Sequence, residues 1–360
     1  MKDPATVLVT AIGGIGVGEQ IVKALRLAGG YRIVGADINP EIAQSVLVDE
    51  LVTLPAANEP EYVDTLLAAA DHFSASAVFY GSEPELRVLS REREQIHDAG
   101  LFLPLNPATV IDTCMDKAAT NRFLTSLSFP TPKSLVASDL DSLDVVDYFP
   151  VVVKPMLESG GSRDVFIAQS VRELRSIFEF LPARSLIIQE YVGRPDSEYT
   201  VGVLHDMDGV FVNSIAMHRR LTGLLNVRHS VPNSTDRDDL GPELVISSGI
   251  SHGYLDTFPE VTGTCEEIAQ ALGAHGPINI QCRVVDGDVY VFEINPRFSG
   301  TTSIRAMMGY NEPHLLIRRH LLGETIQERF PYEKGLVLRS LTETILPEGK
   351  DHQALMRNRP

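Results

Sequence analysis

Glu293 and Asn295 lie two residues apart near the end of the segment 279–297, NIQCRVVDGDVYVFEINPR. Alternate residues of a strand face the same side, so this carboxylate and this amide would lie about 7 Å apart on one face. Hard cations such as Mg²⁺ take oxygen ligands of this kind and keep waters or phosphate oxygens in their other positions. Arg297 follows two residues later, and a cation beside a metal-binding carboxylate suits phosphate recognition. The alternative is a solvated polar face on an edge hairpin.

The same segment predicts a hairpin whose two strands share one apolar face. Its alternating apolar residues are Ile278, Ile280, Cys282 and Val284 before the turn and Tyr290, Phe292 and Ile294 after it. Packing both runs on one core sets Gln281 opposite Glu293 and Asn279 opposite Asn295 on the other face. It also sets Cys282 opposite Phe292 and requires a three-residue loop at 286–288. A two-residue Asp-Gly turn would slip the pairing by one residue, so we predict against it.

Two lysines upstream occupy positions that suit phosphate binding. Lys117 lies in a helix that we expect to begin at Thr113, with Asp116 three residues later in a capping-box arrangement. Lys154 ends the apolar strand VVVKP, and the proline after it cannot continue a sheet ladder. Each lysine has an ordinary alternative, because helical lysines are usually solvated and a lysine on an edge strand prevents unwanted pairing.

A glycine-rich loop, ESGGSR at 158–163, follows the strand that ends in Lys154. Glycines let the backbone wrap around an oxyanion, and Ser and Arg add hydrogen-bond donors. The loop therefore predicts a phosphate lid, although the same residues suit an ordinary hairpin loop. The lid residues would be Ser159, Gly160, Gly161 and Ser162.

The strand SLIIQEYV at 185–192 leads to Gly-Arg-Pro at 193–195, which breaks the ladder and marks a domain crossing. A strand edge exposes alternating N–H and C=O groups, and these match the donor and acceptor edge of adenine. The pattern therefore points to Glu190, Tyr191 and Val192 as a site for the base.

Three charged residues are candidate substrate contacts. Glu83 follows the strand SAVFYG at the carboxyl edge, where open α/β sheets bind ligands, and helix capping is its alternative role. Arg219 and Arg220 belong to the most basic patch of the chain, at 217–229. Arginine suits carboxylate or phosphate, although an exposed charged loop would look the same.

Residues 6–37 have the pattern strand, Gly-rich turn, helix and strand, which is a βαβ unit of an open parallel sheet. Glycines at 13, 14, 16 and 18 offer N–H groups to an anion, and Asp37 ends the next strand where a ribose-binding acid would lie. These features support a rival function, an NAD(P)-dependent oxidoreductase. However, Glu19 stands where the dinucleotide fingerprint needs its third glycine, so a tight turn for helix packing is the competing interpretation.

Composition limits the remaining possibilities. A chain of 360 residues predicts two or three domains, because one core stops growing near about 300 residues. The net charge of −17, from 31 basic and 48 acidic side chains, argues against nucleic-acid or anionic-membrane partners. Three widely spaced cysteines without metal-ligand spacing predict reduced thiols in a cytoplasmic protein. We also expect no signal peptide and no membrane span.

With these pieces in order, the chain resembles the ATP-grasp superfamily, and within it the ATP-binding halves of the carbamoyl-phosphate synthetase large subunit and similar carboxylate–amine ligases. The motifs that carry the resemblance are DK at 116–117, VVVKP at 151–155, SGGSR at 159–163, QEYV at 189–192 and EINPR at 293–297. The resemblance implies a mixed α/β and α+β fold. Its parts would be a Rossmann-like pre-grasp domain (1–112), a small lid subdomain (113–190), a large subdomain with the metal site (191–330), and a C-terminal strand and tail (331–360).

The resemblance also implies how the nucleotide is held. Lys117 and Lys154 are similar to the two lysines that hold the ATP phosphates beneath the lid. Residues Glu190 to Val192 resemble the hinge whose backbone reads adenine, and Glu198 resembles the carboxylate that binds ribose.

For the chemistry, the resemblance implies Mg²⁺, with Mn²⁺ as an alternative, on Gln281, Glu293 and Asn295, and catalytic roles for Arg297 and Lys154. The implied reaction activates a small carboxylic acid as an acyl phosphate and joins it to an amine. The synthetase itself needs two such halves and a glutaminase partner, so carbamoyl-phosphate synthesis is not implied. The expected partners are small molecules and a second copy in a homodimer. The competing interpretations are the oxidoreductase and a nucleotide-binding grasp protein without turnover.

Overall fold

The computed structural model describes residues 5–156, 164–181 and 185–341. Its first domain contains a parallel sheet in the order β3-β2-β1-β4, as the βαβ pattern predicts. The elements are β1 (Ala5–Val9), α1 (Val17–Ala28), β2 (Tyr31–Asp37), the 3₁₀ helix η1 (Ala43–Leu47), β3 (Glu50–Thr53), α2 (Tyr62–His72), β4 (Ala77–Phe79), α3 (Glu83–Arg91) and α4 (Arg93–Asp98). Alternate residues face opposite sides, so Val7 and Val9 pack with α1, whereas Leu8 packs with α2 and α3. Both faces of the sheet are therefore covered.

The next part of the chain begins with two helices and continues into a small antiparallel sheet, in the order β5-β8-β6-β7. Its elements are α5 (Ala108–Met115), α6 (Lys117–Ser126), β5 (Ser134–Ala137), η2 (Asp141–Val145), β6 (Val151–Pro155), β7 (Phe166–Ala168), α7 (Val171–Phe180) and β8 (Leu186–Glu190). The predicted helix start at Thr113 is wrong, because Thr113 lies inside α5. Asp116 caps α6 instead, since its side chain accepts two backbone N–H bonds of the first turn. Lys117 is therefore the first residue of a helix.

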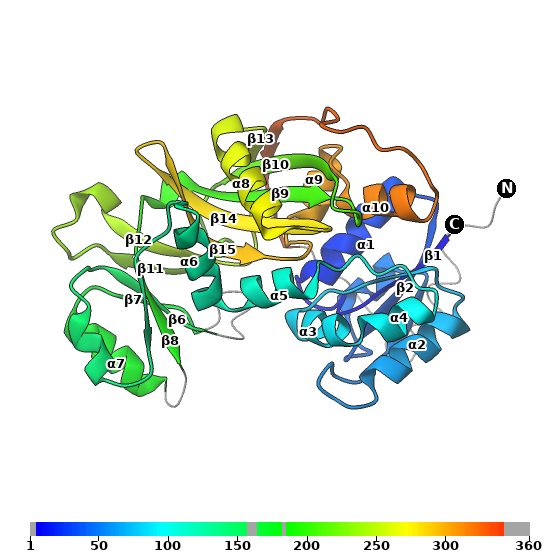
Figure 1. Cartoon of the computed structure of the whole chain (residues 1–360), viewed down its shortest axis with the longest axis horizontal. Coiled ribbons are helices and arrows are strands. Elements are labelled where there is room, and N and C mark those ends of the chain that lie inside the picture. The colour runs from blue at the N-terminus through cyan, green and yellow to red at the C-terminus, as the bar shows by residue number, and fades with distance from the viewer. Residues whose placement is uncertain (1–4, 157–163, 182–184, 342–360) are drawn as a thin grey trace.

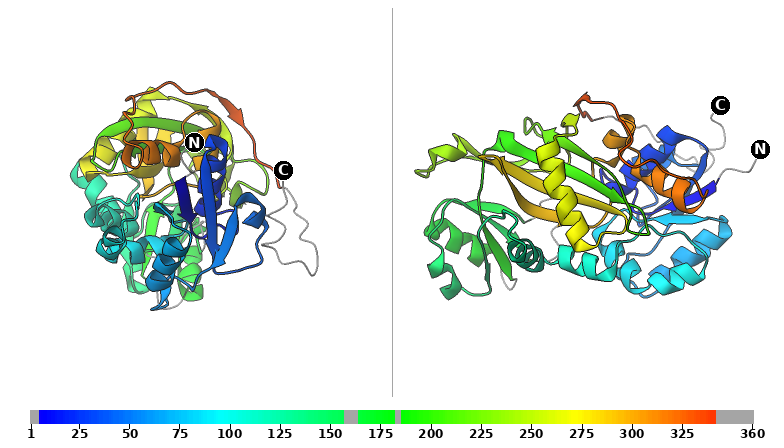
Figure 2. Two further views of the ribbon diagram at one scale, coloured as in Figure 1. Left: turned by 90° about the vertical axis from the view of Figure 1, so that its right-hand side faces the viewer. Right: turned by 45° about the horizontal axis from the view of Figure 1, so that its top comes forward.

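A six-stranded antiparallel sheet, in the order β15-β14-β9-β10-β13-β16, forms the largest part of the molecule. The elements of this part are η4 (Pro195–Ser197), β9 (Glu198–His205), β10 (Phe211–Arg219), β11 (Val227–Pro232), η5 (Asp238–Leu240), β12 (Glu243–Ser247), β13 (Gly253–Asp256), α8 (Pro259–Leu272), β14 (Pro277–Val285), β15 (Asp288–Asn295), α9 (Thr302–Met307), α10 (Glu312–His320) and β16 (Gly335–Val337). Helix α8 crosses one face, as the yellow helix in Figure 2 shows, and packs Val261, Cys265 and Ile268 on it. Helices α9 and α10 lie on the side that faces α1 (Figure 1).

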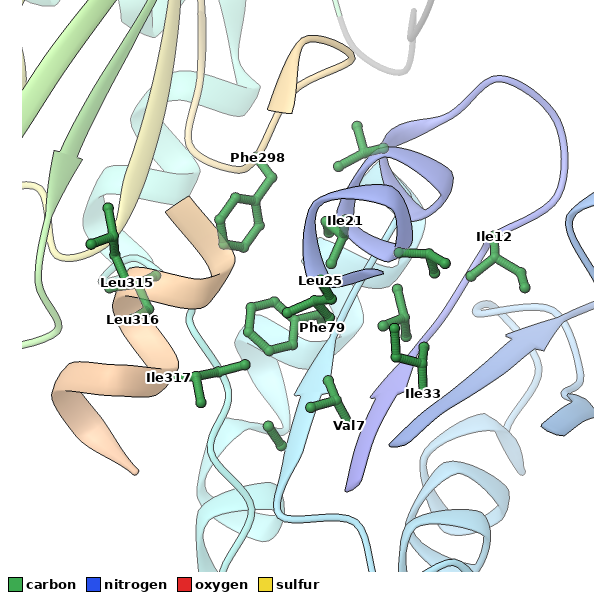
Figure 3. Close-up of a cluster of buried hydrophobic side chains, with 14 of the residues drawn as sticks. Val7, Ile12, Ile21, Leu25, Ile33, Phe79, Phe298, Leu315, Leu316 and Ile317 are labelled. Carbon is green, nitrogen blue, oxygen red and sulfur yellow. The ribbon is translucent and has the colours of Figure 1, made fainter. Parts of the chain in front are cut away.

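One apolar cluster joins the large sheet to the first domain. Phe298 and the α10 side chains Leu316 and Ile317 pack with Ile21 and Phe79 of the first domain (Figure 3). All five side chains are at most 1% exposed. Burying one such side chain stabilises the fold by about 1.5–3 kcal/mol, so the two parts are held firmly together. The shared core fixes the end of β4 relative to the segment that follows β15.

The hairpin β14–β15 has the predicted partners at one end. Gln281 lies opposite Glu293, and Asn279 lies opposite Asn295, as the alternation pattern predicts. Beyond Gln281 the register shifts by one residue, because Phe292 is an extra residue in β15 without a partner in β14. Such an insertion is a β-bulge, which bends the strand and redirects its backbone.

The bulge changes the turn of this hairpin. Asp286 and Gly287 form a two-residue turn, with φ angles of 52° and 92°, and the predicted three-residue loop is wrong. The extra residue absorbs the one-residue slip that counted against this turn. Cys282 consequently pairs with Val291, and Val291 rather than Phe292 is buried in the core beneath α8. The prediction that Phe292 shares the apolar face is therefore also wrong.

The three cysteines, Cys114, Cys265 and Cys282, are buried and form no disulfide. None of the helices in the described ranges is both long and apolar enough to cross a membrane.

Candidate active site

The polar face of β14–β15 carries the three predicted metal ligands. Gln281 Nε2 donates to Glu293 Oε2 at 2.8 Å, so this amide and this carboxylate lie side by side. Asn295 is two residues further along β15, and its Oδ1 accepts from Arg297 at 3.2 Å. Because Gln281 uses its amide nitrogen on Glu293, its carbonyl oxygen is the end left for a ligand. The three residues thus offer carboxylate and amide oxygens, which is the donor set that a hard divalent cation prefers.

Lys154 approaches this face from β6 of the small antiparallel sheet. Its Nζ donates to Gln189 Oε1 at 2.9 Å and to the carbonyl oxygen of Phe292, the bulge residue, at 3.3 Å. Burial lowers the pKa of Lys154 to about 8, an effect that Glu293 opposes and Lys117 increases. The bulge therefore turns a backbone carbonyl toward a buried amine that lies next to the metal face. An anionic phosphate would compensate for the charge of this amine.

Lys117 lines the cleft between the small antiparallel sheet and the large sheet. One cavity here is bordered by Lys117, Glu83, Glu293 and Asn295, and an adjoining cavity runs along β8. The two cavities share four lining residues, which include Lys117 and Glu293. The cleft therefore brings both predicted phosphate-binding lysines to the metal face. The predicted lid residues Ser159, Gly160, Gly161 and Ser162 lie outside the described residues.

Glu83 and Arg297, which are 214 residues apart, form an ion pair at this end of the cleft, with 2.7 Å between Oε1 and NH2. Burial alone would raise the pKa of Glu83, but Arg297, Lys117 and Arg87 outweigh burial and lower it. The capping side chain of α3 is that of Ser82, so Glu83 is not the helix cap. Its carboxylate instead fixes the arginine that follows the metal ligands.

The predicted adenine hinge borders the second cavity. Glu190, Tyr191 and Val192 line it together with the apolar side chains Pro132, Val152, Val165 and Ile246. The N–H groups of Glu190 and Tyr191 are bonded to the carbonyl oxygens of Lys133 and Pro150, at 2.8 and 3.0 Å. The predicted hinge thus has apolar walls that suit a flat base. Within the described ranges, the N–H of Val192 donates no backbone hydrogen bond, in contrast to those of Glu190 and Tyr191.

Glu198 lies in the wall of the same cavity and is held by two arginines. Arg219 NH1 is 2.8 Å from its Oε1, and Arg283 NH2 is 2.9 Å from its Oε2. Burial raises the pKa of Glu198, but the two guanidinium groups outweigh burial and lower it. The guanidinium of Arg283 also lies 4.5 Å from the centre of the Tyr191 ring. Both carboxylate oxygens are therefore engaged, and the cluster joins the hinge to the large sheet.

Arg219 is not placed where the sequence predicts a substrate contact. It is 3% exposed, and its guanidinium also donates to Ser247 Oγ and to the carbonyl of Ser248 at 2.8 Å. Its buried contacts argue for a structural role beside the second cavity. The next residue, Arg220, is exposed. The sequence analysis missed Arg283, although the period of two that selects Gln281 on the polar face selects Arg283 as well.

The Gly-rich turn after β1 binds side chains of its own chain. Asp37 Oδ2 accepts from the N–H of Gly13 at 2.7 Å. Gln44 Nε2 donates to the carbonyl of Gly14 at 2.7 Å and to Glu19 Oε2 at 3.1 Å. The acid predicted to bind ribose therefore fills part of the turn itself. This arrangement argues against a dinucleotide site and for the packing role of the turn.

Two family models match the two ends of the chain. Residues 7–103 match the family described as PylC-like, N-terminal domain. Residues 247–344, which contain the hairpin and Arg297, match the family described as ATP-grasp in the biosynthetic pathway with Ter operon. The C-terminal part of the chain is therefore similar to this ATP-grasp family. The parallel first domain and the two parts that follow confirm the predicted fold class.

Curated relatives of this chain include large chains of carbamoyl phosphate synthase. The one from Thermoanaerobacter pseudethanolicus is 28% identical over 237 residues, which are 63% of this chain and 20% of the relative. The one from Helicobacter pylori is 29% identical over 205 residues, which are 54% of this chain and 17% of the relative. The chain thus spans about a fifth or less of the length of these relatives.

Solved structures agree with the ATP-grasp fold. N5-carboxyaminoimidazole synthetase from Staphylococcus aureus, complexed with ADP, gives a TM-score of 0.63 at 14% identity, covering 93% of this chain and 81% of that chain. L-amino acid ligase from Bacillus licheniformis gives a TM-score of 0.61 at 18% identity, covering 89% of this chain and 75% of that chain. At these identities the likeness establishes the fold alone.

Proposed function

We propose that the protein is an ATP- and Mg²⁺-dependent ligase that activates a small carboxylic acid as an acyl phosphate and joins it to an amine. The observation that carries the proposal is the arrangement around Glu293. Gln281 lies against its carboxylate, the buried amine of Lys154 approaches from the lid subdomain, and Glu83, which is paired with Arg297, borders the same cleft. Oxygen ligands, a buried cation and an arginine fixed at the edge of the cleft are parts that phosphoryl transfer requires.

ATP would bind along the two adjoining cavities. The base would lie between the apolar walls and read the backbone at Val192, and Lys117 and Lys154 would hold the phosphates. Because both oxygens of Glu198 are engaged by arginines, we assign it to positioning the ribose wall, where a hydroxyl could share one of its oxygens.

Gln281, Glu293 and Asn295 would hold Mg²⁺, or Mn²⁺ in its place, since both ions accept oxygen ligands. When bound, the ion would supply positive charge against the phosphate oxygens. The residues present fit this group, because the set contains one carboxylate and two amide oxygens, and Gln281 and Glu293 lie side by side.

The chain itself would supply orientation and charge in two steps. In the first, an oxygen of the acid attacks the γ-phosphorus and ADP leaves, which produces an acyl phosphate. In the second, the amine nitrogen attacks the carbonyl carbon, phosphate leaves, and the nitrogen loses a proton. Arg297 would stabilise the transferred phosphoryl group, and Glu83 prevents its guanidinium from turning away. No nucleophile from the protein is needed.

Several properties follow as proposals from the same interpretation. The domain limits would be 1–112, 113–190, 191–330 and 331–360, with β16 adding to the edge of the large sheet. The partners would be a small carboxylic acid, an amine and a second copy of the chain. A cytoplasmic location is supported by three buried thiols that form no disulfide.

The test is ADP release measured over a matrix of carboxylic acids and amines. Release should require one acid and one amine together, and hydroxylamine should trap the activated acid as a hydroxamate when the amine is left out. A thermal-shift panel of ATP with Mg²⁺ against NAD(P)H tests the rival function, because a ligand stabilises only the state that it binds. Stabilisation by NAD(P)H alone would overturn the proposal. Nucleotide binding without ADP release across the whole matrix would favour a nucleotide-binding protein without turnover.

A further inference from the structure

A cavity of about 600 Å³ lies on the other side of the Glu83–Arg297 ion pair. Glu83 lines both this cavity and the one that contains Glu293 and Asn295, so the ion pair forms the boundary between them. The volume lies within the range of about 300–1,000 Å³ that small-molecule sites occupy. A molecule held here would lie next to the position of the transferred phosphoryl group. On the ligase function proposed above, the acid would bind in this cavity.

The charge of this cavity is opposite to that of the protein. Arg87 and Arg91 lie one turn apart on α3, which places them on the same face of the helix, and both line the cavity. With Arg297 they make three guanidinium groups against the single carboxylate of Glu83. The whole chain, in contrast, has a net charge of −17. Local positive charge of this kind favours an anionic ligand, because screening over about 8 Å makes nearby charges dominate.

Helix α1 adds to this positive potential. Gly16, which caps the helix without a side-chain hydrogen bond, and Val17 both line the cavity. The helix can come this close because a Cβ on Gly18 would lie 2.4 Å from the carbonyl of Thr10, and one on Gly81 would lie 2.7 Å from Gly18. The first-turn N–H groups of an α-helix have no partner within the helix and carry partial positive charge. The arginines and the helix thus act on the same space.

We propose that the acid substrate is a dianion. One carboxylate would lie beside Arg297 and be phosphorylated, and a second anionic group, a carboxylate or a phosphate, would bind Arg87 and Arg91. This proposal rests on the ligase function proposed above. An acid with one anionic group would satisfy Arg297 and leave the two arginines of α3 without a partner from the ligand.

Calorimetric binding to the full chain, with matched pairs of acids, tests the proposal. The pairs are succinate against succinamate, glutamate against glutamine, and phosphoglycolate against glycolate, so each pair differs in one anionic group. In at least one pair we expect the acid with two anionic groups to bind about tenfold to a hundredfold more tightly than the acid with one, as charge-assisted hydrogen bonds do. Preference for phosphoglycolate would identify phosphate as the second group, and preference for a dicarboxylate would identify carboxylate.

Variants of Arg91, an exposed residue of α3, show whether α3 causes the preference for acids with two anionic groups. Arg91→Gln should remove most of the preference, and Arg91→Lys should restore part of it. Arg172→Gln, at an exposed position of α7 away from this cavity, is the control and should leave the preference unchanged. Equal affinity within all three pairs, or a preference that survives in Arg91→Gln, would overturn the proposal.

ADP release separates this proposal from the ligase function. Release with monoacids as efficient as with dianions would overturn the dianionic substrate and leave the ligase function intact. Absence of release with every acid, together with dianion binding that depends on Arg91, would overturn the ligase function and retain the anion site.

Discussion

The buried amine of Lys154 should make nucleotide binding depend on pH. Burial lowers its pKa from 10.5 to about 8. In the free protein about nine-tenths of the molecules would then carry the charge at pH 7, and about one-tenth at pH 9. If only the ammonium form binds phosphate, the affinity for nucleotide is present below pH 8 and falls about tenfold between pH 7 and pH 9.

Calorimetric titration with ADP and Mg²⁺ measures this affinity without the amine substrate, whose own protonation would confuse a rate. Lys154→Arg is the matched control, since a guanidinium stays charged over this range and should give a flat profile. Lys154→Met should also be flat, with an affinity about tenfold or more below that of the parent at pH 7. A flat profile in the parent would refute the contact with phosphate. The same tenfold fall in Lys154→Arg would show that another group titrates.

The same lowered pKa predicts how stability changes with pH. Between pH 8 and pH 10.5 the unfolded chain binds a proton at Lys154 that the folded protein does not, so stability rises with pH in this window and is lost as pH falls through 8. Urea unfolding of the parent and of Lys154→Arg at each pH isolates this contribution. The difference between their free energies of unfolding should grow by about 2–3 kcal/mol from pH 7.5 to pH 10. A constant difference would mean that the pKa of Lys154 is not lowered.

Three further changes test other parts of the site. Glu293→Gln should lower ADP release by about a hundredfold or more without changing the urea midpoint, as compared with Glu267→Gln at an exposed position of α8; full activity would contradict the metal assignment. Arg219→Gln breaks the buried pair with Glu198 and should cost about 3 kcal/mol in urea unfolding, with a larger rise in KM for ATP than for the acid. A rise in the KM for the acid alone would instead support the substrate contact that the sequence predicts. Gly287→Ala, at a φ of 92°, should destabilise the protein by about 1 kcal/mol and leave both KM values unchanged; an unchanged urea midpoint would count against the two-residue turn.

Local patterns predicted much of the fold and the centre of the site. Alternation of apolar residues placed Gln281 opposite Glu293, because one face of the hairpin has to be buried beneath α8. The strand–turn–helix–strand pattern of residues 6–37 predicted the parallel sheet, because a βαβ unit places its two strands parallel. The prediction that the strand ends at Lys154 is wrong, because β6 continues to Pro155, which is paired with Leu186.

Where two local rules disagreed, the prediction kept only one of them. The apolar pattern and the Asp-Gly turn required registers that differ by one residue, and we kept the pattern. The protein satisfies both rules by a bulge at Phe292, which lets Val291 enter the core and keeps the turn. The bulge also directs a carbonyl to Lys154, so this irregular residue is part of the site.

The sequence by itself determined which residues share one face of a strand and which helices follow which strands, and hence which side chains form the polar face of β14–β15. Only the tertiary structure decided which charged groups meet. Glu83 pairs with Arg297 across 214 residues, and Glu198 meets Arg219 and Arg283 because β9 lies between β10 and β14. Such partners depend on the order of strands and on the packing of whole domains. Neighbouring residues fix the periodicity of a helix or strand, but they carry no information about which distant element will pack beside that helix or strand.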